Sequence, residues 1–261
     1  MPDTTVYGVK IHYDEIKPKV KTSKPVLLFL HGWCSNTQSF EAQFKHFSRS
    51  HHCIAVDLPG FGKSAKPKIE FTLTIYGEIL NQFCKQMALD SPILIGHSMG
   101  GLLALEMSWQ EPDMPKKIIL IDPAPIIQIK EIRQNMRQTL DNLREYGKEK
   151  QVQQMMDRFL FRPDSDPALK EKAKQAAIQA DTDAAINIWQ HMIEYNGKRA
   201  FKSAVAPIFY ISGTLQQNQR PALERIQPTL TWAQVMMGSH NCHQTEYDQV
   251  NAMLDRILAD S

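Results

Sequence analysis

The amino-acid sequence predicts an α/β protein with a mostly parallel central sheet, helices on both of its faces and an inserted all-helical cap. Short apolar runs alternate with segments of helical periodicity, a pattern typical of strands buried on both faces. A glycine-rich turn, Gly96–Gly100, joins one such run to a helical segment. Residues 126–206 then interrupt the alternation with sequence of helical character alone. Alternating strands and helices favour a parallel sheet covered by helices, so the interruption predicts an insertion.

The expected core elements follow from apolar patterning. The first strand alternates apolar and polar residues, whereas runs such as Pro25–Leu30 and Cys53–Val56 are continuously apolar, as strands buried on both faces are. Helical spacing predicts the helices that connect them. The strands are expected at Val6–Tyr13, Pro25–Leu30, Cys53–Val56, Pro92–Ile95, Lys117–Ile121, Pro207–Ile211 and Thr231–Val235, and the helices at Leu73–Met87, around Leu102–Met107 and at Tyr247–Leu258.

The helical block predicts a cap. Glycines and prolines divide it into segments, because both residue types end helices. These segments are Glu131–Tyr146, Gln151–Leu160, Ala168–Ala180 and Asp183–Tyr195. We expect one core domain, residues 1–125 and 207–261, with the cap, residues 126–206, over the carboxyl edge of the sheet, where open α/β sheets bind ligands. A structural bundle elsewhere on the surface is the alternative.

Composition argues against several classes of partner. The chain has 261 residues, with 30 Lys and Arg against 28 Asp and Glu, and its net charge of +2 gives no strong field for nucleic acid. The N-terminus lacks a signal-peptide pattern and no apolar run approaches the roughly 18 residues of a membrane span, so we expect a cytoplasmic protein. The scattered cysteines predict reduced thiols rather than disulfides or a metal site. They are Cys34, Cys53, Cys84 and Cys242.

The turn Gly96-His97-Ser98-Met99-Gly100 has the pattern Gly-x-Ser-x-Gly between a strand and a helix. So sharp a turn places the serine in a strained conformation, and side chains two positions before or after it would collide with the strand or the helix. Ser98 is thereby exposed above the sheet as a candidate nucleophile. The backbone NH of Met99, at the start of the helix, points to where negative charge would develop on a substrate. This geometry suits acyl transfer, and His97 is expected only to pack in the turn.

Further stretches resemble the α/β-hydrolase superfamily over nearly the whole chain. Besides the turn, which matches the nucleophile elbow of that family, they are His31-Gly32-Trp33, Asp57–Ser64, Leu120–Ala124 and Gly238-Ser239-His240. The resemblance implies the α/β-hydrolase fold and a serine nucleophile that requires no cofactor. It also implies that the backbone NH of Trp33 completes an oxyanion hole with that of Met99.

The resemblance further implies that serine, acid and histidine follow one another in this order along the chain. Of the nine histidines, only three follow Ser98, and one of these, His191, lies in the predicted cap. His240 follows the predicted last strand and precedes the final helix, so we expect it to be the general base. His243 is the second candidate.

The acid departs from the common pattern of the family. Most relatives place an aspartate three residues beyond the glycine that ends the penultimate strand, where this chain has Gln216. An amide can orient an imidazole but cannot stabilise imidazolium, so a carboxylate is wanted elsewhere. Asp122 is the expected replacement because some members keep their acid at the end of this strand, although many carry an aspartate there in any case. Glu224 is the reserve, and a serine–histidine dyad is the remaining alternative.

The expected activity is hydrolysis of a carboxylic ester or lactone through an acyl-enzyme on Ser98, with N-acyl-homoserine lactones as one substrate class by analogy. Methionine and aromatic residues in the cap indicate, if part of them faces Ser98, an adaptable pocket for a small apolar or amphipathic substrate. These residues are Met136, Met155, Met156, Phe159, Trp189, Met192 and Tyr195.

Two other functions stay open. Cofactor-free dioxygenases that cleave the ring of 3-hydroxy-4-quinolones share this fold and resemble the chain at Gly32-Trp33-Cys34 and Asp122. They tend to carry histidines, however, where this chain has Ser35 and Met99. A catalytically silent ligand-binding protein is suggested only by Gln216. A haloalkane dehalogenase is disfavoured because its nucleophile would be an aspartate.

Overall fold

The computed structural model describes residues 2–214 and 218–259 of the chain. An eight-stranded sheet forms its centre, in the order β1-β2-β4-β3-β5-β6-β7-β8. The strands are β1 (Asp3–Val6), β2 (Val9–Ile16), β3 (Leu27–Leu30), β4 (Cys53–Val56), β5 (Ile93–His97), β6 (Lys117–Ile121), β7 (Ile208–Ser212) and β8 (Thr231–Gln234). β2 pairs antiparallel with β1 and β4, and the other neighbouring pairs are parallel, which confirms the predicted mostly parallel sheet.

The predicted first strand, Val6–Tyr13, is wrong in its extent. Tyr7 and Gly8, with φ of 48° and 80°, form a tight turn that separates β1 from β2. Val6 pairs with Val9 across this turn. Positive φ at both positions of a two-residue turn matches the twist of an antiparallel hairpin. The apolar alternation continues through the turn, so periodicity alone does not reveal it.

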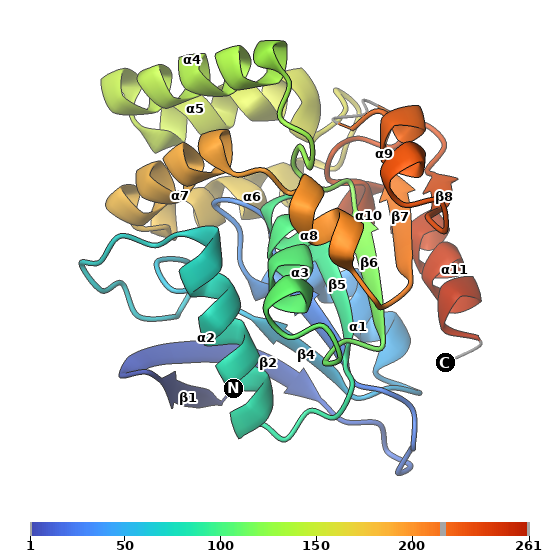
Figure 1. The fold of residues 1–261 in the computed structure, drawn as a ribbon. Coiled ribbons are helices and arrows are strands. Elements are labelled where there is room, and N and C mark those ends of the chain that lie inside the picture. Colours follow the sequence, from blue (N-terminus) through green and yellow to red (C-terminus); the bar gives the residue numbers. More distant parts are fainter. Residues whose placement is uncertain (1, 215–217, 260–261) are drawn as a thin grey trace.

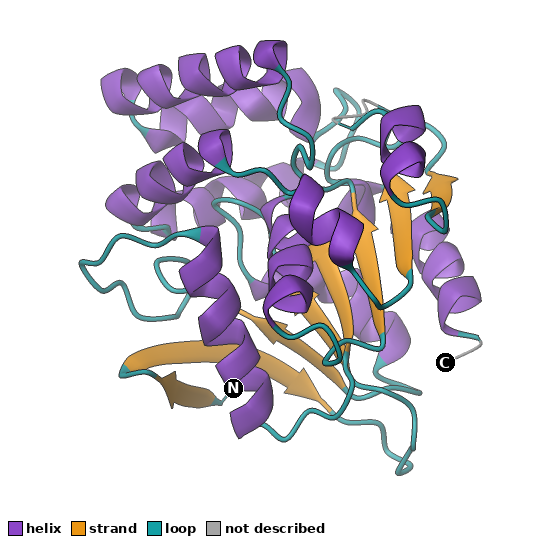
Figure 2. Ribbon diagram, viewed as in Figure 1, coloured by secondary structure: helices purple, strands orange, loops and turns teal. Residues whose placement is uncertain are grey.

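Helices cover both faces of the sheet and bury two separate apolar clusters (Figures 1 and 2). Along β3, Leu28 and Leu30 join the cluster under α2 and α3. Leu27 and Phe29 join the cluster under α1 and α11. This two-sided burial explains why the central strands are continuously apolar. The helices of the two faces are η1 (Thr37–Phe40), α1 (Glu41–Phe47), α2 (Leu73–Gln86), α3 (Met99–Gln110), α8 (Lys198–Ser203), α9 (Arg220–Ile226), α10 (Cys242–Thr245) and α11 (Tyr247–Leu258).

Between β6 and β7, the chain forms a helical layer over the edge at which the parallel strands end (Figure 1). Asp166 and Asp181 begin two of its helices by accepting hydrogen bonds from the amides of Ala168 and Ala184. Among the described residues, none of the helices is long and apolar enough to cross a membrane. The layer consists of α4 (Lys130–Tyr146), α5 (Lys148–Met155), the π-helical turn η2 (Met156–Leu160), α6 (Pro167–Gln179) and α7 (Thr182–Glu194).

Candidate active site

Ser98 occupies the tight turn between β5 and α3, with φ of 53° and ψ of −117°. Such a conformation costs a non-glycine residue about 1–3 kcal/mol, so the surroundings must hold it. The flanking glycines make the turn possible, because a Cβ on Gly96 would collide with the backbone of Gly100, and one on Gly100 with the carbonyl group of Leu30. Ser98 is half-buried at the point where the strand meets the helix. The turn therefore presents the hydroxyl group beyond the end of the sheet.

Asp122 directly follows β6 and is completely buried, and its φ of 37° is also unusual for a residue other than glycine. Its Oδ2 lies 2.6 Å from Nδ1 of His240, and its Oδ1 accepts a hydrogen bond of 3.1 Å from the amide of Gly213. A carboxylate in this position requires Nδ1 of His240 to carry a proton, which leaves Nε2 as the proton acceptor of the neutral ring. The pair thus fixes both the orientation and the tautomer of the imidazole.

The backbone around His240 is held from two directions. Nε2 of His97 donates a hydrogen bond of 3.0 Å to the carbonyl oxygen of His240, from the residue next to Ser98. On the other side, the amides of His240 and Asn241 each donate a bond of 3.1 Å to the carbonyl oxygens of Phe159 and Leu160 in η2. The elbow and the helical layer therefore both position this histidine.

Ser98 and His240 line one cavity of about 110 Å³, which extends from the elbow to the helical layer. Its wall on that side is made of apolar and aromatic side chains, which leave few polar partners for a ligand. Tyr195, also considered from the sequence, instead donates a hydrogen bond of 2.9 Å to the buried Glu106. The residues from the helical layer that line the cavity are Met136, Val152, Met155, Phe159, Leu160, Ala173, Trp189 and Met192.

The loop after β3 lies against Ser98. A Cβ on Gly32 would come within 3.2 Å of the Cβ of Ser98. Trp33 joins this loop to the helical layer, because its Nε1 donates a hydrogen bond of 2.9 Å to the carbonyl oxygen of Ala185. The amide of Met99 occupies the first position of α3, where a helix offers it no acceptor. The role of the Trp33 and Met99 amides as an oxyanion hole stays a prediction.

The alternative residues have other surroundings. His243 is buried with its ring centroid 4.1 Å from that of His97, and burial lowers its pKa to about 3, so the ring stays neutral. Glu224 pairs with Arg220 on the surface of α9 at 2.6 Å. Gln216 lies outside the described residues.

The thiol of Cys34, in the loop after β3, does not have the features of a nucleophile. Cys34 is buried, and burial raises the pKa of its thiol. The neutral thiol is a poor nucleophile, because the thiolate is the reactive form.

Sequence reasoning missed two side chains that support the site. One is His97, which was expected only to pack in the turn. The other is Asn218, which braces the loop after Asp122 by accepting a bond of 2.7 Å from the amide of Ile126 and donating one of 3.0 Å to the carbonyl oxygen of Pro123. Both contacts join segments that lie far apart in the chain, so no local pattern signals them.

A family model described as the alpha/beta hydrolase fold matches residues 25–219, and the chain therefore belongs to this family. A curated relative, 2-(acetamidomethylene)succinate hydrolase of Mesorhizobium japonicum, is 32% identical over 108 residues, which are 41% of this chain and 39% of that protein. The chain covers 28% and 42% of the length of two further relatives, an abhydrolase domain-containing protein of Caenorhabditis elegans and an uncharacterized hydrolase of Bacillus subtilis.

Solved structures share the fold along the whole chain. The enol-lactonase from Burkholderia xenovorans superposes with a TM-score of 0.89 at 16% identity, covering 99% of this chain and 100% of its own. A thermophilic esterase from Thermogutta terrifontis superposes with a TM-score of 0.85 at 20% identity, covering 100% of this chain and 99% of its own. At these identities the similarity shows the α/β-hydrolase fold alone. Proteins of this fold catalyse many different reactions.

Proposed function

We propose that the protein is a serine hydrolase that cleaves a carboxylic ester or lactone through an acyl-enzyme on Ser98. The observation that carries the proposal is the 2.6 Å contact between Asp122 Oδ2 and Nδ1 of His240, a histidine that lines the same cavity as Ser98. A buried carboxylate, an oriented imidazole and a presented hydroxyl are the groups that acyl transfer requires. The similar proteins, which include a hydrolase, an esterase and an enol-lactonase, support the same class of reaction.

Acylation follows from these positions. Nε2 of His240 takes the proton of Ser98 as Oγ forms a bond to the carbonyl carbon of the substrate. The carbonyl oxygen becomes an oxyanion, which the amides of Trp33 and Met99 stabilise by about 3 kcal/mol each on the scale of protease oxyanion donors. Asp122 stabilises the imidazolium. The carbon–oxygen bond to the alcohol then breaks, and the alcohol leaves with the proton from His240.

Deacylation repeats the sequence with water. His240 takes one proton from a water molecule as its oxygen attacks the acyl carbon. The bond between that carbon and Ser98 Oγ breaks, Oγ regains the proton, and the carboxylic acid is released. In a lactone the alcohol and acid belong to one molecule, so the product is a hydroxy acid. Each step uses only side chains and amides of this chain and water.

The cavity supports a small acyl group as substrate. Its volume of about 110 Å³ is less than the roughly 150 Å³ of an engineered apolar cavity that holds benzene. Short or branched acyl groups therefore fit better than long chains, and the substrate is a small apolar or amphipathic molecule. An N-acyl-homoserine lactone is accommodated only if its acyl chain is short. In this proposal residues 126–206 act as a cap over the core domain, residues 1–125 and 207–261, and supply the apolar wall.

The other two functions receive less support. The position of Asp122 beside His240 supplies the carboxylate whose absence at Gln216 suggested a silent protein, and the chain lacks the histidines that the dioxygenases tend to carry at Ser35 and Met99. An oxygen electrode separates the classes, because a dioxygenase consumes oxygen with an alkyl hydroxyquinolone and a hydrolase does not.

The test is hydrolysis of p-nitrophenyl esters with acyl chains of increasing length, together with a panel of lactones. We expect kcat/KM to be highest for the shortest acyl chains and Ser98→Ala to lower kcat by about 10⁴-fold or more. Ser203→Ala, on the exposed end of α8, serves as the matched control. If the purified protein cleaves no member of the panel, or if Ser98→Ala leaves cleavage unchanged, the proposal is wrong.

A further inference from the structure

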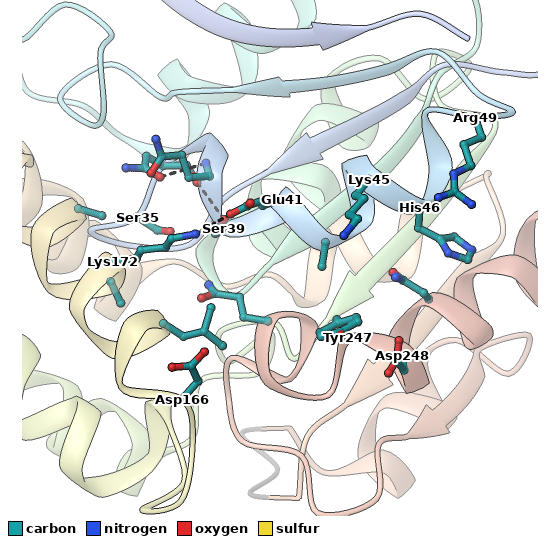
Figure 3. A pocket seen from close by; sticks show the side chains of 18 residues that line it. Ser35, Ser39, Glu41, Lys45, His46, Arg49, Asp166, Lys172, Tyr247 and Asp248 are labelled. Atoms are coloured by element: carbon teal, nitrogen blue, oxygen red, sulfur yellow. Dashed lines mark hydrogen bonds and ion pairs between the residues drawn. The ribbon is translucent and has the colours of Figure 1, made fainter. Parts of the chain in front are cut away.

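A second and larger cavity adjoins the active site. It has a volume of about 470 Å³ and lies between α1 and α6, with the beginning of α11 as its third wall (Figure 3). We call it the α1–α6 groove and define it by Lys45 on α1, Lys172 and Ala173 on α6, and Gln244 and Tyr247 near α11. The active-site cavity of about 110 Å³ has room for a small acyl group but not for a large alcohol as well. A larger ester therefore needs a second space for its alcohol.

The groove shares part of its wall with the active-site cavity. Ser35, Ala173 and Gln244 line both spaces. Besides Lys172, α6 lines this space with Leu169, Ala173 and Ala176, and the two alanines, which carry only a methyl group, leave room in it. A larger residue at position 173 would stand where the two spaces meet.

The position of the shared wall indicates which half of a substrate lies in the groove. The leaving alcohol takes its proton from His240, so it must lie on the side of this histidine. Gln244, in α10 and directly after the His240 loop, belongs to both spaces. The wall from α4, α5 and α7 surrounds the active-site cavity and does not line the groove. The acyl group therefore occupies the active-site cavity, and the alcohol extends into the groove.

The charges along the groove favour an acidic group on that alcohol. Lys45 and Arg49, four residues apart, both line it, and neither has a hydrogen-bond or ion-pair partner among the residues that the structure describes (Figure 3). The carboxylate of Asp248, which likewise has no partner among the residues that the structure describes, opposes them from the start of α11.

Three further charged side chains line the groove. Glu41 pairs with Lys172 at 2.6 Å. Asp166 accepts a hydrogen bond of 2.8 Å from the amide of Ala168 at the start of α6 and retains its negative charge. The lining therefore carries three cations and three carboxylates, and Lys45 and Arg49 together form its locally positive side.

We propose that the α1–α6 groove is the leaving-group site of the enzyme and that it takes an elongated alcohol ending in a carboxylate or phosphate, recognised by Lys45 and Arg49. The inference rests on the proposed function, since it assigns the second half of the ester that Ser98 cleaves. Ala173 limits how far a long alcohol can extend into the groove. Lys45 and Arg49 bind the charge at its end.

The probes are three acetate esters with the same acyl group: ethyl acetate, methyl 6-acetoxyhexanoate and 6-acetoxyhexanoate. Release of acetate is measured by chromatography. We expect the wild type to prefer the acid over its methyl ester by about tenfold in kcat/KM at low salt, with the preference falling as salt screens the charges. Lys45→Ala/Arg49→Ala should bring the ratio of the two long esters close to one. Lys19→Ala/Lys21→Ala, on an exposed loop, is the charge-matched control and should leave the ratio unchanged.

Ala173→Phe places a larger side chain where the groove meets the active-site cavity, and so it tests the placement of the alcohol independently of its charge. It should lower kcat/KM for both long esters by about tenfold relative to ethyl acetate. A ratio between the long esters that Lys45→Ala/Arg49→Ala does not change, or equal losses for the long and short esters in Ala173→Phe, would overturn the proposal. Failure of the proposed function is a different result, because then ethyl acetate itself would not be cleaved in a Ser98-dependent manner.

Discussion

The sheet edge and the helical layer contribute opposite kinds of surface to the same cavity. At the sheet edge, Ser98 and Asp122 both have positive φ and are held by glycines and buried hydrogen bonds, so their positions depend on the backbone. In the helical layer, the wall consists mainly of side chains such as Met136, Met155 and Met192, which can adopt several rotamers. If the proposed function is correct, a rigid frame determines the chemistry and an exchangeable lining determines the substrate. Changes to the frame should abolish activity, whereas changes to the lining should redirect it.

The largest effect should come from the acid. Asp122→Asn keeps the size of the side chain but stabilises the wrong tautomer of His240 and cannot stabilise its protonated form. We expect kcat/KM for p-nitrophenyl acetate to fall by about 10³- to 10⁴-fold, measured by release of nitrophenol. Glu224→Gln, the matched control on the reserve acid, should retain the wild-type rate. Equal activity of Asp122→Asn and the wild type would show that Asp122 is not the acid that acts on His240.

The buried histidines of the core should make its stability depend on pH. His243 has a pKa of about 3 in the folded protein against an ordinary value of 6.5, so the unfolded chain binds a proton in this interval that the folded protein does not. The contribution to stability is present above pH 6.5 and is lost as the pH falls toward 3. Between about pH 7.5 and pH 5 the free energy of unfolding should fall by about 2 kcal/mol from this group.

Urea unfolding at the two pH values measures this dependence. Burial also lowers the pKa of His97 and that of His51, the latter to about 4, so the total loss should exceed that from His243 alone. His243→Gln should reduce the difference between the two pH values, even if the variant is less stable at both. An unchanged difference in this variant would contradict the assignment of a neutral, buried His243.

A smaller effect is expected from the link between the elbow and the histidine loop. His97→Leu removes the donor to the carbonyl oxygen of His240, so this buried acceptor loses a hydrogen bond from the elbow. We expect kcat to fall by about tenfold with KM nearly unchanged, since the loop shifts and the substrate wall does not. His97→Asn, whose amide can donate, should recover part of the loss. A change in KM alone would place His97 in the substrate wall instead.

The smallest effect should come from the side chains of the helical layer that line the active-site cavity. Met155→Ala enlarges the active-site cavity and should shift the preferred acyl chain of p-nitrophenyl esters to a longer one, with changes in kcat/KM of about tenfold or less. Met253→Ala, on α11 and outside this cavity, is the size-matched control. Loss of activity on all esters alike would show that the cap holds the frame as well as the substrate.

The fold could be predicted in most of its parts because its signals are local. Continuous apolar runs correctly predicted β4 and β6 to the residue, and the helical segments of the insertion agree closely with α4 and α7. The short elements α1, α8, α9 and α10 were not predicted, since a helix of four to seven residues has too few turns for a periodic pattern. The hairpin at Tyr7 and Gly8 was missed because the alternation of side chains continues through it.

The site was less accessible to sequence reasoning. The elbow around Ser98 has a local signature, but the neighbourhood of Asp122 and His240 depends on two loops that only the assembled sheet brings together. The contacts of His97 and Asn218 with distant carbonyl groups, and the small volume of the cavity, arise from packing that no spacing encodes. The sequence therefore identifies the reacting groups more readily than the supports that orient them.

If Asp122 and His240 activate Ser98, an active-site fluorophosphonate should react with this serine and only slowly without the histidine. The rate of labelling and the modified peptide are measured by mass spectrometry in the wild type and in His240→Gln. We predict one adduct per chain, on Ser98, with a labelling rate at least about 10³-fold lower in His240→Gln. An adduct on another residue, no adduct at all, or equal rates in the two proteins would contradict the account.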